Sequence, residues 1–148
     1  MRKLLAPVFV FVFVIIITLF VYQISQQSSG FKYVDIQGRI FKVEIADTAE
    51  KQTKGLSNRS ALPVKQGLLF IFKKEEVYPF WMKDMLFPLD IIWFNQNKEV
   101  VFISENNQPC RDSFCQSINP GREALYVLEV NAGVVKTIGL KMGEKIEF

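Results

Sequence analysis

The first feature of the hydrophobic pattern is an uninterrupted apolar run near the N-terminus. Between Leu4 and Tyr22 there is no charged residue. As a helix rising 1.5 Å per residue, this run reaches about 28 Å, close to the thickness of a bilayer's hydrocarbon core. Arg2 and Lys3 precede it, and positive residues favour the cytoplasmic side. We expect a single-pass membrane helix with its N-terminus in the cytoplasm and the rest of the chain outside.

A cleaved signal peptide is the alternative interpretation of the same run. The apolar part of a signal peptide is normally about 7–15 residues long, which is shorter than this one. Ser28, Ser29 and Gly30 form a weak cleavage site. Both interpretations put the rest of the chain outside the cytoplasm, periplasmic or at the cell surface. The sequence therefore divides into residues 1–30, an anchor or signal peptide with a polar spacer, and an extracytoplasmic domain over residues 31–148.

The pattern after the spacer is mostly that of β-strands. Residues 39–45 alternate polar and apolar, as in a half-buried strand, and residues 31–36 pair with them through a turn at Gln37 and Gly38. Further strands are predicted over residues 67–72, 77–83, 89–94, 99–104, 124–130 and 145–148.

Cap residues predict two short helices among these strands. The first is capped by Asp47 and ends near Gly55; the second is capped by Asn131 and ends near Gly139. Many short strands with one or two short helices predict a mainly β fold, a compact β-barrel or sandwich, here preceded by an N-terminal transmembrane helix.

The composition limits which partners, catalytic groups and metal sites the chain can have. The net charge is +3, but Arg2 and Lys3 account for two of the 18 basic residues, which leaves 16 against 15 acidic ones. No basic field remains, so we expect no nucleic-acid partner. The chain contains no His, which excludes Ser-His and Cys-His catalysis and imidazole metal sites. We predict neither a metal nor a cofactor.

Cys110 and Cys115 are the only cysteines, with four residues between them. Outside the cytoplasm, a disulfide that closes this tight loop is the expected outcome. A redox pair usually has two intervening residues, and a zinc site would need two further good ligands. The spacing therefore favours a structural disulfide.

The densest group of candidate binding residues lies between Tyr78 and Asp90. Strand alternation puts Trp81 and Lys83 on one face, where together with Asp90 they form a plausible floor for a small polar ligand. Arg59, after the first predicted helix, is a candidate for the same pocket. The alternative is structural: Trp81 lies in the core and Lys83 forms an ion pair with Asp90.

Several segments of this region resemble DUF192, also called UPF0127, a family of uncharacterised exported or membrane-anchored proteins. The most specific segment is Phe80-Trp81-Met82-Lys83, and Pro109-Cys110 with Cys115 also matches. The resemblance runs from about Val43 to Phe148 and departs at Asp84, where the family usually has Asn. It implies a compact β-barrel behind a signal peptide or anchor, and it implies no reaction.

Three functions remain open at this point. The first is a non-catalytic binding module for a small polar ligand or an envelope component, with the cysteine loop at the rim of its pocket. The second is a hydrolase or transferase that uses Asp90 with Lys83 or Glu105. The third is a structural docking protein of the cell envelope.

Overall fold

The computed structural model describes residues 13–19, 30–110 and 114–148, in two compact units, Met1–Gly30 and Phe31–Phe148. Residues 13–19 are helical. Within the described part of the chain, no helix is long and apolar enough to cross a membrane. The predicted membrane span over residues 4–22 lies mostly outside the described residues.

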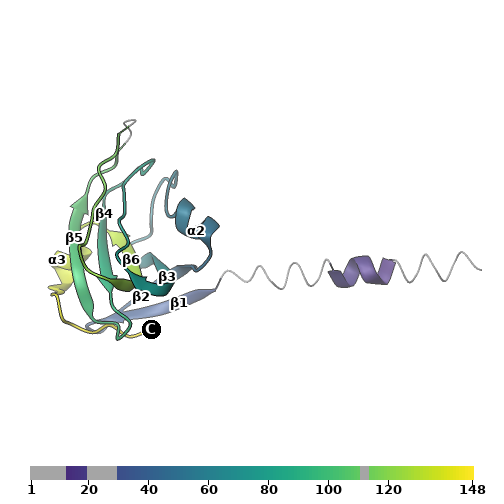
Figure 1. Cartoon of the computed structure of the whole chain (residues 1–148), viewed down its shortest axis with the longest axis horizontal. Coiled ribbons are helices and arrows are strands. Elements are labelled where there is room, and N and C mark those ends of the chain that lie inside the picture. Colours follow the sequence, from purple (N-terminus) through teal and green to yellow (C-terminus); the bar gives the residue numbers. More distant parts are fainter. Residues whose placement is uncertain (1–12, 20–29, 111–113) are drawn as a thin grey trace, which may run out of the picture. The chain divides into compact units, whose positions relative to one another are not determined.

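The second unit is built on one six-stranded sheet with the order β1-β2-β3-β6-β4-β5 (Figure 1). β2 and β3 run parallel, and every other neighbouring pair is antiparallel. The strands are β1 (Phe31–Ile36), β2 (Arg39–Ala46), β3 (Gln66–Glu76), β4 (Leu89–Phe94), β5 (Val100–Asn107) and β6 (Ala124–Asn131). The prediction of a mainly β fold is confirmed.

The first hairpin forms where its turn residues predict it. Gln37 and Gly38, between β1 and β2, have φ angles of 52° and 80°. Two successive positive φ angles are typical of the tight turns that match the twist of paired antiparallel strands. The hairpin prediction is therefore confirmed, and so is the second hairpin, formed by β4 and β5.

The finer prediction of a compact β-barrel or sandwich is wrong, because the described strands form one open sheet with β1 and β5 at its edges. The C-terminal segment was expected to be a final strand. It makes only isolated bridges, Asp35 with Glu147 and Glu99 with Lys145. One bridge on each side does not build a ladder, so the segment touches both edge strands without joining them into a continuous barrel wall.

Residues 77–83 were also expected to form a strand, and this prediction is wrong. The segment makes only isolated bridges, Phe80 with Ile118 and Lys83 with Cys110. Pro79 has no N–H to donate to a ladder, and Asp84 has a φ of 57°, which ends extended backbone. Asp and Asn are the side chains that best tolerate this conformation.

Both helices are present, but their N-caps differ from the predicted ones. Helix α2 (Ala49–Lys54) is capped by Thr48, whose hydroxyl accepts from the N–H of Lys51. Helix α3 (Val134–Ile138) follows Gly133, while Asn131 belongs to β6 and donates its side-chain N–H to Leu62. Asp47 and Asn131 are therefore not caps. The predicted C-terminal ends at Gly55 and Gly139 are confirmed.

The two helices lie on opposite sides of the sheet (Figure 1). We call these sides the α2 face and the α3 face. Ile92 and Leu128 pack on the α3 face with Val135, and Trp93 and Val127 pack on the α2 face. Because side chains alternate along a strand, neighbouring residues of β4 and β6 serve different cores. This alternation decides which polar side chains can meet.

Candidate functional site

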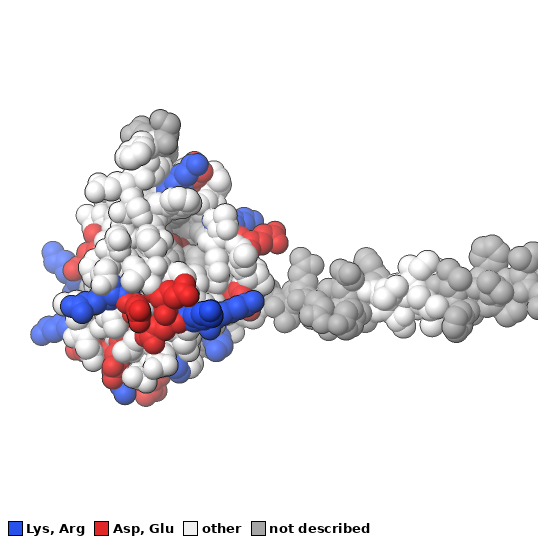
Figure 2. Space-filling view, in the orientation of Figure 1, with Lys and Arg blue, Asp and Glu red and all other residues white. Residues whose placement is uncertain are grey.

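A pocket of about 370 Å³ opens on the α2 face. Its walls come from α2 and from the irregular segment around Tyr78, and its floor comes from β3 and β6. Figure 2, in the orientation of Figure 1, shows acidic and basic side chains intermixed around areas of uncharged surface. The residues that line the pocket include Gln52, Lys54, Phe70, Phe72, Tyr78, Phe80, Trp81 and Glu129.

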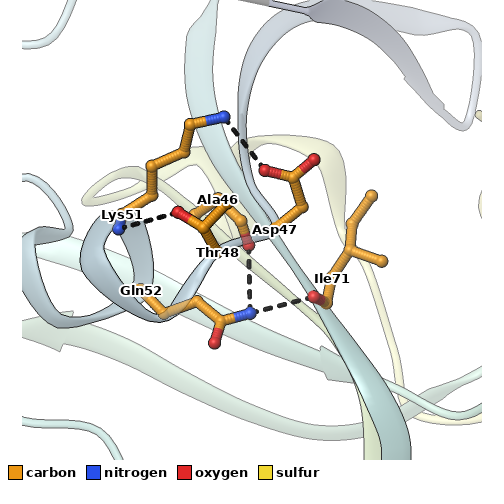
Figure 3. Close-up of polar contacts among 6 residues, drawn as sticks. All are labelled: Ala46, Asp47, Thr48, Lys51, Gln52 and Ile71. Carbon is orange, nitrogen blue, oxygen red and sulfur yellow. Dashed lines mark hydrogen bonds and ion pairs between the residues drawn. The ribbon is translucent and has the colours of Figure 1, made fainter. Parts of the chain in front are cut away.

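The helical wall is fixed to the sheet by a glutamine. The amide of Gln52 donates to the carbonyl of Ala46 at 3.3 Å and to that of Ile71 at 2.9 Å, which ties α2 to β2 and β3 (Figure 3). Lys51 adds an ion pair with Asp47 at 2.9 Å, which lowers the pKa of that carboxyl. A wall held in this way is formed before any ligand arrives, which reduces the entropy lost on binding.

The opposite wall is aromatic. Tyr78 stacks on Phe72 with ring centroids 3.6 Å apart, and Phe80 meets Phe70 edge to face at 4.8 Å. The indole N–H of Trp93 donates to the Tyr78 carbonyl at 2.9 Å. Edge-to-face aromatic pairs contribute about 0.5–1.5 kcal/mol beyond their buried area, so this wall is rigid although it belongs to no strand.

Trp81 lines the pocket and remains 57% exposed, whereas Lys83 is exposed and is not among the lining residues. Between them Met82 is buried, with 4% of its surface exposed. The predicted alternation of exposed and buried side chains is therefore present although the segment is not a strand, but of the two exposed residues it brings only Trp81 into the pocket. An exposed indole on a concave, largely apolar surface is a common anchor for ligands.

Glu129 of β6 is the acidic residue of the floor. It is 5% exposed, and its Oε2 atom has no hydrogen-bond partner among the described residues. Its neighbours across the ladders are apolar, Leu68 on β3 and Ile91 on β4. Burial raises the pKa of Glu129 from its ordinary value of 4.5 to about 8, although the positive charge of Arg59 acts in the opposite direction.

Arg59 is bound to Glu44 of β2. Its two guanidinium nitrogens donate to the two carboxylate oxygens, at 2.5 and 2.8 Å. This bidentate pair lowers the pKa of Glu44 and raises that of Arg59, chiefly through the hydrogen bonds. Arg59 is not among the residues that line the pocket, and its charge reaches Glu129 only through space.

Asp90 does not meet Trp81 in the structure. It lies on β4 between Leu89 and Ile91, which face α2, so its own side chain points to the α3 face. There one oxygen accepts from the N–H of Asn106 at 2.8 Å and the other from the N–H of Val135 at 2.9 Å. Asp90 is completely buried. Its carboxyl group holds the end of β5 and the first turn of α3 against β4.

The ion pairs of the described residues do not include one between Lys83 and Asp90. Glu105 is exposed and does not line the pocket. Among the described residues, no ion pair or hydrogen bond therefore joins the side chain of Asp90 to that of Lys83 or Glu105, the partners that the sequence suggested for a hydrolase.

The predicted disulfide between Cys110 and Cys115 is confirmed, with Cα atoms 5.7 Å apart. The N–H of Cys110 donates to Met82 at 2.9 Å, and Asp84 donates to Cys110 at 3.2 Å. The base of the loop therefore holds the segment that carries Trp81. Cys110 and Cys115 are not among the lining residues of the pocket, and residues 111–113 lie outside the described part of the chain.

The sequence reasoning missed Glu129, although a signal was present. Val127 and Glu129 are two residues apart in a strand that is otherwise apolar from residue 124 to residue 130, so they share a face. A carboxyl group on the same face as a buried Val is costly unless it is paired or neutral. In the parts of the chain that the structure describes, no three Cys, Asp or Glu side chains gather where a metal ion would be held.

These features define a class of small open-sheet β domain with a preformed aromatic pocket behind a short helix. The chain matches DUF192, described as an uncharacterized ACR, over residues 32–148, and it belongs to this family. The resemblance read from the Trp81 and Cys110 segments is confirmed.

Two solved structures share the fold. A protein of unknown function from Novosphingobium aromaticivorans DSM 12444 is 30% identical with a TM-score of 0.74, over 82% of this chain and 89% of that one. A putative transcription regulator from Sinorhizobium meliloti 1021 is also 30% identical, with a TM-score of 0.73, over 81% of this chain and 95% of that one. No curated protein sequence matches the chain.

Proposed function

We propose that this protein is a non-catalytic binding module that takes a small ligand in the pocket between α2 and the Tyr78–Trp81 segment. The observation that carries the proposal is a preformed pocket of about 370 Å³ with aromatic walls and one buried carboxyl oxygen without a partner among the described residues. A mostly apolar cavity with a few polar groups is the usual form of a small-molecule site. The concave shape favours a small ligand over docking of a flat protein surface.

We further propose that the module works outside the cytoplasm, held on a membrane by residues 4–22. The uncharged N-terminal run and the two basic residues before it support this location. The Cys110–Cys115 bridge supports it independently, because disulfides persist in oxidising compartments.

The relative from Sinorhizobium meliloti bears the description of a transcription regulator. The proposal does not extend that activity to this chain, because residues 31–148 carry 16 basic and 15 acidic side chains. Proteins that bind nucleic acid usually gather positive charge on one face.

The test is a fragment screen on the full chain in detergent, read by thermal shift and by ligand-observed NMR. Trp81→Ala should abolish most of the shifts seen with the wild type, because it removes an aromatic wall without touching the core. Tyr33→Ala is the matched control, since it also truncates an exposed aromatic residue (65% exposed) that does not line this pocket. Fragments that bind wild type, Trp81→Ala and Tyr33→Ala equally would contradict the proposal.

A further inference from the structure

The charged groups around the pocket suggest what its ligand must supply. Among the described residues that line it, Glu129 is the only acid and Lys54 of α2 is the only cation. Arg59 is engaged by Glu44, and the Lys54 side chain is exposed. Across the strands on either side of Glu129 there are only apolar residues. The described part of the chain therefore places no cation in contact with the Glu129 carboxyl inside the pocket.

The unpartnered Oε2 atom calls for a hydrogen-bond donor. A buried acceptor left without a partner costs about 1–3 kcal/mol, so a ligand that donates to it recovers this energy. Two lining donors are already engaged, because the Tyr78 hydroxyl donates to the carbonyl of Lys74 at 2.8 Å and the Gln52 amide donates to those of Ala46 and Ile71, so neither supplies it. The hydrogen bond would be strongest if the donor were itself charged.

The aromatic walls favour the same charge on the ligand. Phe70, Phe80 and Trp81 line the same pocket as Glu129. The faces of aromatic rings carry negative potential and attract cations, with Trp the strongest of them. A cation with an apolar body would therefore satisfy the walls and the floor together.

We propose that the pocket binds a small protonated amine, whose N–H group donates to Glu129 and whose apolar body lies against Phe70, Phe80 and Trp81. This inference rests on the proposed binding function and deepens it. A free alkylamine and the side chain of a lysine offer the same chemistry, and the experiment below separates the two sources.

Binding of an amine must displace a proton. The pKa of Glu129 is raised to about 8 in the empty pocket, so at pH 7 the carboxyl is mostly neutral. An ammonium group stabilises the ionised form, and the carboxyl proton then leaves to the buffer. The groups that oppose or assist this step are Arg59 and Lys54, both cationic, and Glu44, which neutralises Arg59. The association constant should rise about tenfold per pH unit from pH 6 to about 8.

The experiment is isothermal titration of the full chain with phenethylamine at several pH values, in buffers of different ionisation enthalpy. Phenethyl alcohol is the neutral isostere, and the trimethylated phenethylammonium ion is a cation without an N–H donor. We expect the amine to bind at least about tenfold more tightly than either. Nα-acetyl-lysine methylamide, in which only the side-chain amine is free, tests the lysine source. Binding as tight as that of phenethylamine points to lysine side chains as the ligand, and weaker binding points to free amines. Both outcomes support the inference.

Two variants sharpen the test. Glu129→Gln keeps the shape of the side chain and should lose about tenfold in affinity for the amine, together with the proton release. Lys54→Gln removes the exposed cation and should strengthen amine binding about twofold. If the alcohol binds as well as the amine, if Glu129→Gln binds the amine unchanged, or if Lys54→Gln weakens binding, the amine inference is wrong.

A different result would contradict the proposed binding function itself. It fails if no fragment of any charge binds in a Trp81-dependent manner. Neutral fragments that do bind in this way would keep the pocket and reject only the amine.

Discussion

Two buried acids on the two faces of one sheet have opposite surroundings. Asp90 faces α3 and accepts one backbone N–H on each oxygen. Glu129 faces the pocket beside α2, and its Oε2 atom has no partner among the described residues. Both lie in apolar strands, and both are almost completely buried.

The difference separates a carboxyl group that holds the fold together from one that we propose serves a ligand. Burial of a carboxyl group is tolerated when the fold itself supplies the hydrogen bonds, as it does for Asp90. Glu129 instead avoids the cost by holding a proton, which leaves an acid–base group at the floor of a cavity. Strongly perturbed pKa values in concave sites are typical of binding and catalytic groups.

The largest expected effect concerns the pH dependence of stability. The pKa of Glu129 is raised from 4.5 to about 8 in the folded protein, so between these values the folded state holds a proton that the unfolded state has released. The free energy of unfolding should therefore fall as pH rises from about 5 to 9, by up to about 4–5 kcal/mol at about 1.4 kcal/mol per pH unit.

Urea unfolding of the full chain at several pH values measures this fall. Glu129→Gln should remove most of it, while Glu105→Gln, which changes an exposed acid, should leave it in place. A wild type whose stability does not change across this range would show that Glu129 is already charged in the folded state, and would remove the contrast with Asp90.

The next largest effect is expected when Asp90 is substituted, and it concerns the free energy of unfolding. Asp90→Ala leaves the N–H group of Val135 buried without an acceptor, at about 1–3 kcal/mol, and removes the acceptor of the more exposed Asn106 N–H at a smaller cost, so we expect a loss of roughly 2–3 kcal/mol in the free energy of unfolding. Asp90→Asn keeps one acceptor oxygen and should lose about half as much. Ligand binding in the folded fraction should be unchanged in both variants. Weakened binding at unchanged stability would mean that Asp90 serves the site after all.

A smaller effect is expected at Arg59, which pairs with Glu44 and whose positive charge lowers the pKa of Glu129. Arg59→Met breaks the pair with Glu44 and should cost about 1 kcal/mol at pH 7, because the pair is partly exposed. The pKa of Glu44 is lowered by this pair, so the contribution is present above about pH 4.5 and disappears as pH falls through the folded-state value.

Urea unfolding at pH 7 and at pH 3 measures this contribution. Arg59→Lys is the control, since it keeps the charge without the bidentate geometry. The same Arg59→Met change should raise the pKa of Glu129 further, since the positive charge of Arg59 lowers it. An Arg59→Met variant with an unchanged Glu129 pKa would show that the two groups are not coupled.

The sequence predicts local features well because nearby residues determine them. The β1–β2 turn follows from Gln37 and Gly38, and β4 is predicted at residues 89–94 because that segment is rich in aromatic residues and Ile. The same reasoning fails at residues 77–83, where Pro79 and the pairing with Ile118 override an aromatic-rich pattern.

The roles of the two acids require information from distant parts of the chain. In the sequence, Asp90 and Glu129 are both single acids within apolar strands. Asp90 is satisfied by Val135, 45 residues away, and Glu129 receives nothing comparable from its ladder neighbours Leu68 and Ile91. Sequence reasoning therefore selected Trp81, which lines the pocket, together with Asp90, which does not, and it missed Glu129, which does.

The most direct measurement is a carbon-13 NMR titration of the Glu129 carboxyl group in the full chain, with and without saturating phenethylamine. We predict a midpoint near the pKa of about 8 in the empty pocket and a shift to clearly lower pH when the amine is bound. A midpoint near the ordinary value of 4.5 in the empty pocket, or one that the amine leaves unchanged, would contradict the account.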